Sequence, residues 1–285
     1  MGQPNILTIH GDNTAKSPMV ESRMKLADST SRSGHSLGPT PDSIATSTSD
    51  TGPGGTTAAL AEVIICSGFP TQLTLALILN GIGLQAVASD DQLSFTYVVT
   101  LSLVDAAFIV GLVVYFLHTH GESLGDLING ARPLSRETAL GILLIPILVL
   151  VAIGGLLLIR TMAPSLQNVP ENPLESMLDT PPRALLFGLV VVIAGGVREE
   201  LQRAFILRRF EQHLGGGWLG LAVFSVAFGL GHNIQGWDVA LVTGALGAVW
   251  GALYLIRRSI IASMVSHAGF NLVEIILVVT TVQAM

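Results

Sequence analysis

The chain has 285 residues, of which 50% are hydrophobic and only 12% are charged. Soluble domains average about 25% charged residues, so this composition indicates a membrane protein. The net charge of -6 argues against a nucleic-acid partner, and the single cysteine, Cys66, excludes an intramolecular disulfide.

The first segment, residues 1–58, is polar and rich in Ser, Thr, Gly and Pro. A segment of this kind cannot bury enough apolar area to offset its ordering entropy. We therefore predict a disordered N-terminal tail.

Seven apolar segments follow the tail, and a helix needs roughly 20 apolar residues to cross the hydrocarbon core of a bilayer. We expect these spans over residues 62–87, 93–117, 138–159, 183–205, 218–234, 239–256 and 259–282. A Gly-Phe-Pro sequence predicts a kink in the first segment, and the fifth segment is short. The predicted fold is all-α, a polytopic transmembrane helical bundle of about seven spans.

Basic residues favour the tail and every second loop between the predicted spans. The second, fourth and sixth loops carry arginine pairs: Arg132 and Arg136, Arg208 and Arg209, and Arg257 and Arg258. The positive-inside rule then predicts a cytoplasmic N-terminus. Because no organelle signal is visible, we expect an integral protein of a prokaryotic cytoplasmic membrane.

Three polar clusters lie inside the predicted spans, where ionisable residues are costly and usually mark a functional site. The first is VREELQRAF, in which Arg203 stands four residues after Glu199 and three after Glu200. Both spacings place the partners on one helix face. Arg203 can therefore hold one carboxylate and leave the other free for chemistry or for a metal.

The other two clusters are FGLGH, which ends in His232, and SHAGFN, which contains His267 and Asn271 four residues apart. Glu274 continues the second of these faces, three residues after Asn271. Each cluster alone is compatible with a structural role: an ion pair, a hydrated imidazole or an interhelical hydrogen bond. Converging on one cavity, however, a carboxylate, two imidazoles and an amide are enough to bind a metal or to activate a water.

The ordered motifs on successive membrane helices are a Glu pair with an Arg, then Phe228-xxx-His232, then His267-xxx-Asn271. They resemble the CPBP family, which comprises CAAX prenyl endopeptidases and bacterial Abi-like proteins of bacteriocin processing and self-immunity. The resemblance covers roughly residues 183–282. It implies an intramembrane (metallo)endopeptidase that hydrolyses a peptide bond in a membrane-associated protein or peptide.

The family resemblance also implies roles for the individual residues. Glu199, with Glu200, would be the general base, and His232 would orient or ligate the water. His267 and Asn271 would donate to the oxyanion, with Arg203 and Phe228 in support. Alternatively, Glu199, His232 and His267 would bind Zn²⁺, with water as the fourth ligand. We expect no nucleotide, haem or flavin, and we expect the partners to be the lipid bilayer and the substrate.

The chain departs from the family pattern EExxxR, because Arg203 follows Glu199 by four residues rather than five. Alignment on the arginine places Arg198 at the position of the first glutamate. The catalytic carboxylate is then Glu199 or Glu200, and we favour Glu199 for its i,i+4 link to Arg203. We divide the chain into a tail (1–58), N-terminal transmembrane helices (59–180) and CPBP-like catalytic helices (181–285).

Two other functions fit the same residues. The first is a non-catalytic relative that confers immunity or scaffolds a partner, which the altered motif spacing favours slightly. The second is a proton-coupled transporter, since buried Glu, His and Arg also build proton relays. No internal repeat of the kind that transporters show is apparent.

Overall fold

The computed structural model describes residues 53–88, 92–170 and 172–282. These residues form helices, apart from short connections and one isolated β-bridge between Val87 and Leu93. The predicted all-α class is confirmed for this part of the chain. The predicted tail lies outside the described residues up to residue 52. Its last six residues, 53–58, instead form the start of the first helix, α1 (Pro53–Cys66).

The first predicted span is a bent pair of helices, α1 and α2 (Phe69–Gly81), whose axes differ by 43°. The bend falls at Gly68, which has a φ of 88° that favours glycine, and it is followed by Pro70 in the first turn of α2. The side-chain amide of Gln202 donates to the carbonyl of Cys66 over 2.5 Å. This bond satisfies a backbone acceptor at the end of α1, so the predicted kink is a stable feature of the fold.

Four other helices are long and apolar enough to cross a membrane. They are α3 (Phe95–Thr119), α5 (Leu134–Met162), α9 (Trp237–Arg257) and α10 (Ile261–Val282). With the bent pair counted as one span, the described residues contain up to five such segments. This number is smaller than the seven full spans that we expected.

The two remaining predicted spans differ from full-length helices for separate reasons. The segment 183–205 is divided among α6 (Pro181–Val191), a π-helical turn η3 (Val192–Arg198) and α7 (Glu199–His213), and α7 is rich in charge. The segment 218–234 forms α8 (Gly217–Leu230), which has only 14 residues. At 1.5 Å per residue α8 is about 21 Å long, shorter than a hydrocarbon core of about 30 Å.

Four short elements connect these helices. They are α4 (Leu124–Ile128) and the 3₁₀ turns η1 (Pro164–Leu166), η2 (Glu175–Leu178) and η4 (Asn233–Gln235).

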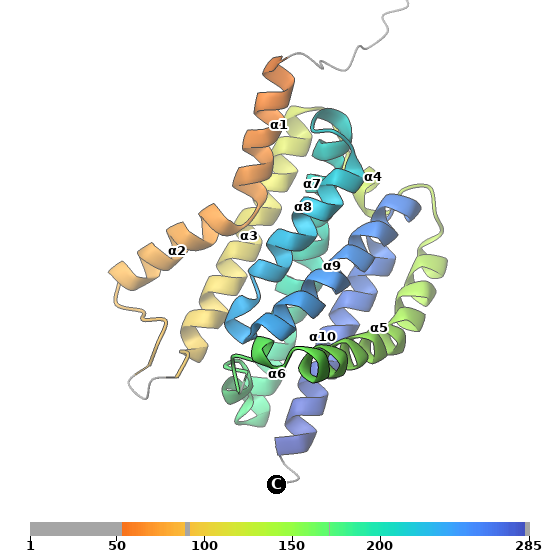
Figure 1. The fold of residues 1–285 in the computed structure, drawn as a ribbon. Helices are drawn as coiled ribbons and strands as arrows, with labels where there is room; N and C mark the ends of the chain where they lie inside the picture. Colours follow the sequence, from red (N-terminus) through yellow and green to blue (C-terminus); the bar gives the residue numbers. More distant parts are fainter. Residues whose placement is uncertain (1–52, 89–91, 171, 283–285) are drawn as a thin grey trace, which may run out of the picture. The chain divides into compact units, whose positions relative to one another are not determined.

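The charged helix α7 lies at the centre of the described helices, where it contacts α1, α3, α8 and α9 (Figure 1). Most of its side chains are buried. The turn η3 packs against α10, which in turn packs along α5, and α8 pairs with α9. As a result, the start of α7, the end of α8 and the first half of α10 meet in the interior.

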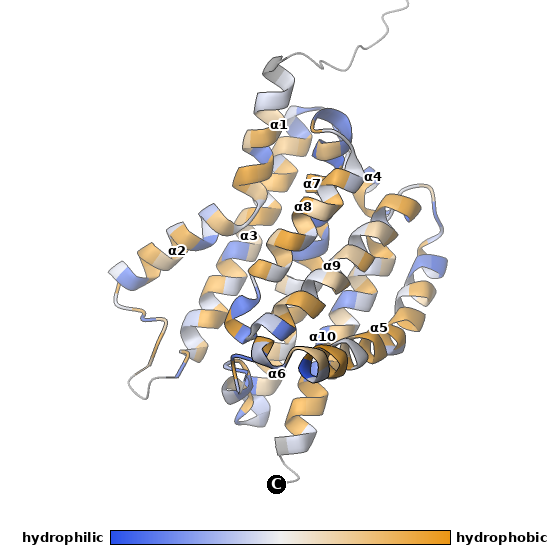
Figure 2. Cartoon of the chain, viewed as in Figure 1, coloured by the Kyte–Doolittle hydropathy of each residue, from blue (hydrophilic) through white to orange (hydrophobic). Residues whose placement is uncertain are grey.

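Large apolar side chains cover the outside of the helices, as the colouring in Figure 2 shows. Leu73, Leu150, Leu185 and Val226 are among those exposed. Exposed apolar surface on this scale is unusual for a soluble monomer and suits contact with lipid. Together with the long apolar helices, it identifies the chain as an integral membrane protein.

A buried ionic cluster, here called the Arg209 network, ties α7 to the elements at one end of the bundle. Arg209 donates to Glu62 of α1 over 2.6 Å and to Glu122, between α3 and α4, over 3.0 Å. Gln212 also donates to Glu122, and His120 lies 2.6 Å from Glu62. Buried charges are tolerated only when they are paired in this way, so the network fixes the position of α7.

Candidate active site

Arg203 donates to Glu200, and both side chains are almost completely buried. The guanidinium also lies against three aromatic rings, with its carbon 4.8 Å from the centre of Phe228, 5.2 Å from Phe224 and 5.7 Å from Trp250. Cation–π contacts of this kind are strongest when they are desolvated. The i,i+4 pairing of Arg203 with Glu199 that we favoured is therefore wrong.

The physical reason is that successive residues of α7 point about 100° apart. Both glutamates satisfy the helical spacing to Arg203, but they leave the helix in different directions: Glu200 points to Arg203 and His267, whereas Glu199 lines the cavity. The general expectation that Arg203 holds one carboxylate and leaves the other free does agree with the structure. Glu199 is the free one: its side chain is 17% exposed, against 1% for Glu200.

His267 of α10 contacts both carboxylates through different nitrogens. Its Nδ1 lies 2.8 Å from Oε1 of Glu200, within hydrogen-bonding distance. Its Nε2 lies 3.8 Å from Oε2 of Glu199, too far for a direct hydrogen bond. The ring stacks on Trp250 with 3.8 Å between ring centres, and Trp250 is itself anchored by a bond from its indole N–H to Ser266. These contacts fix the orientation of the imidazole.

His232 lies just beyond the end of α8, in the turn before α9. Its Nδ1 is 2.8 Å from the backbone carbonyl of Phe228. A carbonyl can only accept, so Nδ1 carries the proton and Nε2 has a free lone pair in the neutral ring. The ring of Phe228 lies 4.8 Å from His232 and 6.2 Å from His267, so this phenylalanine packs between the two imidazoles and Arg203.

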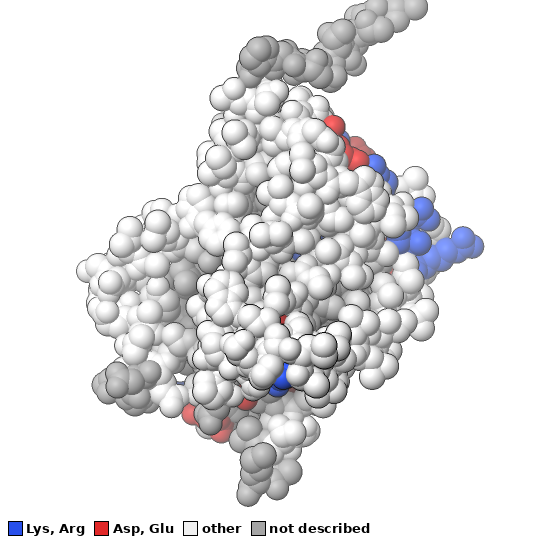
Figure 3. Space-filling model, viewed as in Figure 1, with Lys and Arg blue, Asp and Glu red and all other residues white. Residues whose placement is uncertain are grey.

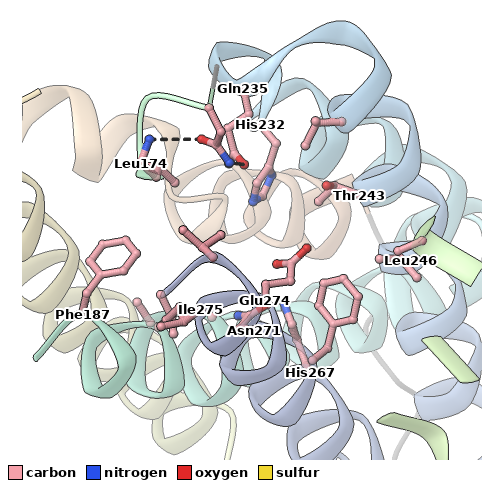
Figure 4. A pocket seen from close by; sticks show the side chains of 18 of the residues that line it. Leu174, Phe187, His232, Gln235, Thr243, Leu246, His267, Asn271, Glu274 and Ile275 are labelled. Atoms are coloured by element: carbon pink, nitrogen blue, oxygen red, sulfur yellow. Dashed lines mark hydrogen bonds between the residues drawn. The ribbon is translucent and has the colours of Figure 1, made fainter. Parts of the chain in front are cut away.

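A cavity of about 300 Å³ joins these groups. Glu199, His232, His267 and Asn271 all line it, as does Glu274. Figure 4 shows His232 and Gln235 on one side of the cavity and His267, Asn271 and Glu274 of α10 on the other. The remaining lining is largely apolar and comes from α3, α5, α6, α9 and α10. The structure thus brings the free carboxylate, both imidazoles and the amide to one cavity.

Two glycines of the π-helical turn allow α10 to approach this closely. A side chain at Gly195 would collide with Nδ2 of Asn271, and one at Gly196 would lie 2.7 Å from Cβ of Ala268. π-Helical turns are rare and are frequent at functional sites. Here the turn immediately precedes Glu199, so it sets the direction in which this residue leaves the helix.

Sequence reasoning did not include the ion pair between Arg198 and Asp105 of α3, which are 2.5 Å apart. Arg198 also lies 3.8 Å from Glu199, and Asp105 accepts from Thr71 and Gln72 of α2. The signal was present in the sequence, since Asp105 is an isolated charge in a long apolar segment. Only its partner could not be read from the sequence. Trp250 was also missed, because one tryptophan in an apolar helix carries no signal of its own.

The donors proposed for zinc are only partly arranged for it. Each imidazole has one ring nitrogen hydrogen-bonded to an acceptor: His267 to Glu200, and His232 to the carbonyl of Phe228. Zinc-binding histidines usually make such a bond. Within the described residues, however, no group of three His, Cys, Asp or Glu side chains is close enough to hold a metal ion. The set of Glu199, His232 and His267 therefore does not fit a three-ligand zinc site in this arrangement.

Comparison with protein families agrees with this geometry. Residues 181–273 match the family model described as type II CAAX prenyl endopeptidase Rce1-like. The matched region runs from the start of α6 into α10. It contains the predicted site residues Glu199, Glu200, Arg203, Phe228, His232, His267 and Asn271, whereas Glu274 and Asp105 lie outside it. This match, over 93 of the 285 residues, supports the resemblance to the CPBP family.

The family match supports a membrane protease of the CAAX type at the level of the family. No curated protein and no solved structure matches the chain.

Proposed function

We propose that the chain is an intramembrane endopeptidase that hydrolyses a peptide bond in a membrane-associated protein or peptide. The observation that carries the proposal is the difference in surroundings between the neighbouring carboxylates of Glu199 and Glu200. Glu200 is buried against Arg203 and His267. Glu199 has only looser contacts, 3.8 Å to Arg198 and 3.8 Å to His267, and it faces the cavity. A general base needs a carboxylate that can reach water, so we assign this role to Glu199.

In the proposed reaction, a water molecule binds between Glu199 and the histidines. Glu199 takes a proton from the water, and the oxygen attacks the carbonyl carbon of the substrate to form a tetrahedral intermediate. The carbon–nitrogen bond then breaks, and Glu199 returns the proton to the leaving amine. The low-dielectric surroundings strengthen each electrostatic contact in this sequence.

The remaining groups act on the water and on the oxyanion. His232 presents the lone pair of Nε2, which can accept a hydrogen bond from the attacking water. Asn271 presents an amide, whose N–H groups donate to the oxyanion. Nδ1 of His267 is hydrogen-bonded to Glu200. When the ring is cationic, its Nε2 donates to the oxyanion of the intermediate. Glu200, Arg203 and Phe228 hold this arrangement in place.

No step of the proposed reaction uses zinc, because no three potential ligands lie close enough together among the described residues. The proposal therefore predicts that cleavage persists in the presence of a zinc chelator. Inhibition that added Zn²⁺ reverses would instead support the zinc-bound alternative, with Glu199, His232 and His267 as its ligands.

We further propose that the partners are the lipid bilayer and a membrane-associated substrate, and that the chain lies in a prokaryotic cytoplasmic membrane. Figure 3 shows most of the visible Lys and Arg atoms beside α4 and the neighbouring ends of α5 and α9. This end carries Arg132, Arg136, Arg257 and Arg258, and Arg132 donates to the carbonyl of Arg257. By the positive-inside rule it faces the cytoplasm, together with the N-terminus.

The test is cleavage of a membrane-peptide library by the purified protein in lipid nanodiscs. We expect Glu199→Gln to abolish cleavage without loss of folding, since Glu199 makes no tight ion pair. Glu200→Gln should reduce both activity and stability. Glu211→Gln is the matched control, because Glu211 pairs with Arg258 at the basic end, away from the cavity. Full activity in Glu199→Gln would refute the assignment.

The same experiment separates the two alternative functions. A non-catalytic immunity or scaffold protein would cleave no peptide, and its phenotype would survive Glu199→Gln. A proton-coupled transporter would lose ion-dependent uptake in that variant, with no peptide cleavage in the wild type.

A further inference from the structure

Each of the four long apolar helices contains one acidic residue, and three of these residues are paired. Asp105 of α3 pairs with Arg198, Glu137 of α5 with Arg257, and Asp238 of α9 with Arg160. The fourth is Glu274 of α10, which has neither a hydrogen bond nor an ion pair with any described residue. This residue is exposed rather than buried among apolar groups. An unpaired carboxylate within a candidate membrane span usually faces a water-filled cavity or a substrate path and marks a functional site.

Glu274 lies in the same cavity as the proposed catalytic groups. It follows Asn271 by three residues and His267 by seven, so the three side chains share one face of α10. Figure 4 shows its carboxylate projecting from α10 into the cavity, on the side opposite His232. None of the proposed catalytic steps uses it.

The lining of the cavity has one sign of charge. Its carboxylates are Glu175, Glu199 and Glu274, and no Lys or Arg is among the lining residues. Arg198 lies 3.8 Å from Glu199, but no Lys or Arg of the described residues pairs with Glu274. A cavity with low-dielectric walls and an excess of negative charge attracts cations.

We propose that Glu274 is a specificity-determining residue that pairs with a Lys or Arg side chain of the substrate. The proposal rests on the proposed peptidase function and adds the substrate class: an apolar peptide that carries a basic residue near the cleaved bond. The apolar residues of the cavity wall contact the rest of the substrate peptide. The ion pair with Glu274 determines which peptide bond lies at the catalytic groups.

The helix geometry limits where this basic residue can stand. Seven residues of α10 at 1.5 Å each place Glu274 about 10 Å along the axis from His267. An extended peptide advances about 3.3–3.6 Å per residue. The basic residue should therefore stand within about three residues of the cleaved bond.

The experiment compares peptides that differ only by Lys or Gln, with the variable residue moved through three positions on each side of the cleaved bond. In the wild type we expect kcat/KM to favour Lys by about tenfold or more at one position. Glu274→Gln should remove this preference and leave cleavage of the Gln peptide nearly unchanged. Glu211→Gln, the same substitution away from the cavity, should retain the preference.

A charge-reversal variant distinguishes a change in specificity from a general loss of activity. Glu274→Lys should prefer a Glu peptide over a Lys peptide at the same position. The proposal is overturned if the wild type shows no preference for Lys at any of these positions. It is equally overturned if Glu274→Gln keeps the wild-type preference.

Binding provides a readout that does not need catalysis. The same Lys and Gln peptides are titrated into nanodisc-embedded wild type and Glu274→Gln by calorimetry. Tighter binding of the Lys peptide to the wild type alone supports the role of Glu274, even if no peptide is cleaved and the peptidase proposal fails. Equal binding of both peptides to both proteins contradicts the role of Glu274, even if cleavage is observed.

Discussion

Nδ1 of His267 lies 2.8 Å from Oε1 of Glu200, and this contact joins α10 to α7 in the interior of the protein. The same carboxylate oxygen accepts from Arg203. One buried carboxylate thus holds both a guanidinium and an imidazole, and it leaves its neighbour Glu199 to face the cavity. The two glutamates of the motif have different surroundings, so they should respond differently to substitution.

Replacing Arg203 by Met should destabilise the protein strongly. The substitution removes the cation and leaves Glu200 buried without it. Breaking a buried ion pair in this way costs about 3–5 kcal/mol. The free energy of unfolding in mixed micelles measures the effect. Arg258→Met is the control, because its pair with Glu211 is largely exposed and contributes roughly 0–1 kcal/mol. Equal losses in both variants would contradict the prediction.

Arg203→Lys should not restore the stability that Arg203→Met loses. The guanidinium lies against the rings of Phe224, Phe228 and Trp250, and an ammonium reproduces neither its planar stacking nor its forked donors. The same unfolding measurement in mixed micelles gives the comparison. A lysine variant as stable as the wild type would mean that charge alone matters at this position.

Asn271→Ala should lower kcat by about 10²–10³-fold with little change in KM, as expected for loss of an oxyanion donor. Steady-state kinetics on any cleaved peptide gives both constants. Leu272→Ala is the neighbouring control on α10, where the side chain is 38% exposed and does not line the cavity. A change confined to KM would mean that Asn271 binds substrate rather than the transition state.

Gly195→Ala should impair cleavage more than it impairs folding. Its new methyl group would collide with the amide of Asn271, a side chain that can move away, and the proposed donor would then be misplaced. Gly154→Ala in α5 is the matched control, since nothing lies within 4 Å of the added methyl group. Activity and thermal unfolding are measured together. Wild-type kinetics in Gly195→Ala would show that Asn271 does not need its present position.

The stability contributed by Glu122 should depend on pH. Burial by itself would raise the pKa of this carboxyl, but the hydrogen bond from Gln212 and the charges of Arg209 and Arg208 lower the pKa below its ordinary value of 4.5. A carboxyl with a lowered folded-state pKa stabilises the protein above its unfolded-state pKa. This contribution is lost as the pH falls through the folded-state value.

The comparison of wild type with Glu122→Gln isolates this effect. The wild type should be the more stable of the two near neutral pH. The difference in unfolding temperature should shrink below about pH 4.3, the usual pKa of a glutamate in an unfolded chain. A difference that stays constant down to pH 2 would show that protonation of Glu122 does not affect the Arg209 network.

The sequence by itself determined the all-α class, the positions of the long apolar helices, the kink near Gly68 and the resemblance to the CPBP family. These features depend on local composition, on glycine and proline, and on motifs whose order is visible along the chain. The membrane character follows from the lack of charge and from the apolar runs. Nothing in these conclusions requires knowledge of which helices are neighbours.

Only the tertiary structure decided which carboxylate Arg203 holds, because Glu199 and Glu200 both satisfy the helical spacing rules. The choice depends on the rings of α8 and α9 that surround the guanidinium, and these come from distant parts of the chain. For the same reason, the pairing of Arg198 with Asp105 could not be predicted from the sequence, nor could the lack of a partner for Glu274 among the described residues. The pairing of charged residues inside a membrane depends on which residues are neighbours in space, because a buried charge is tolerated only when it is paired.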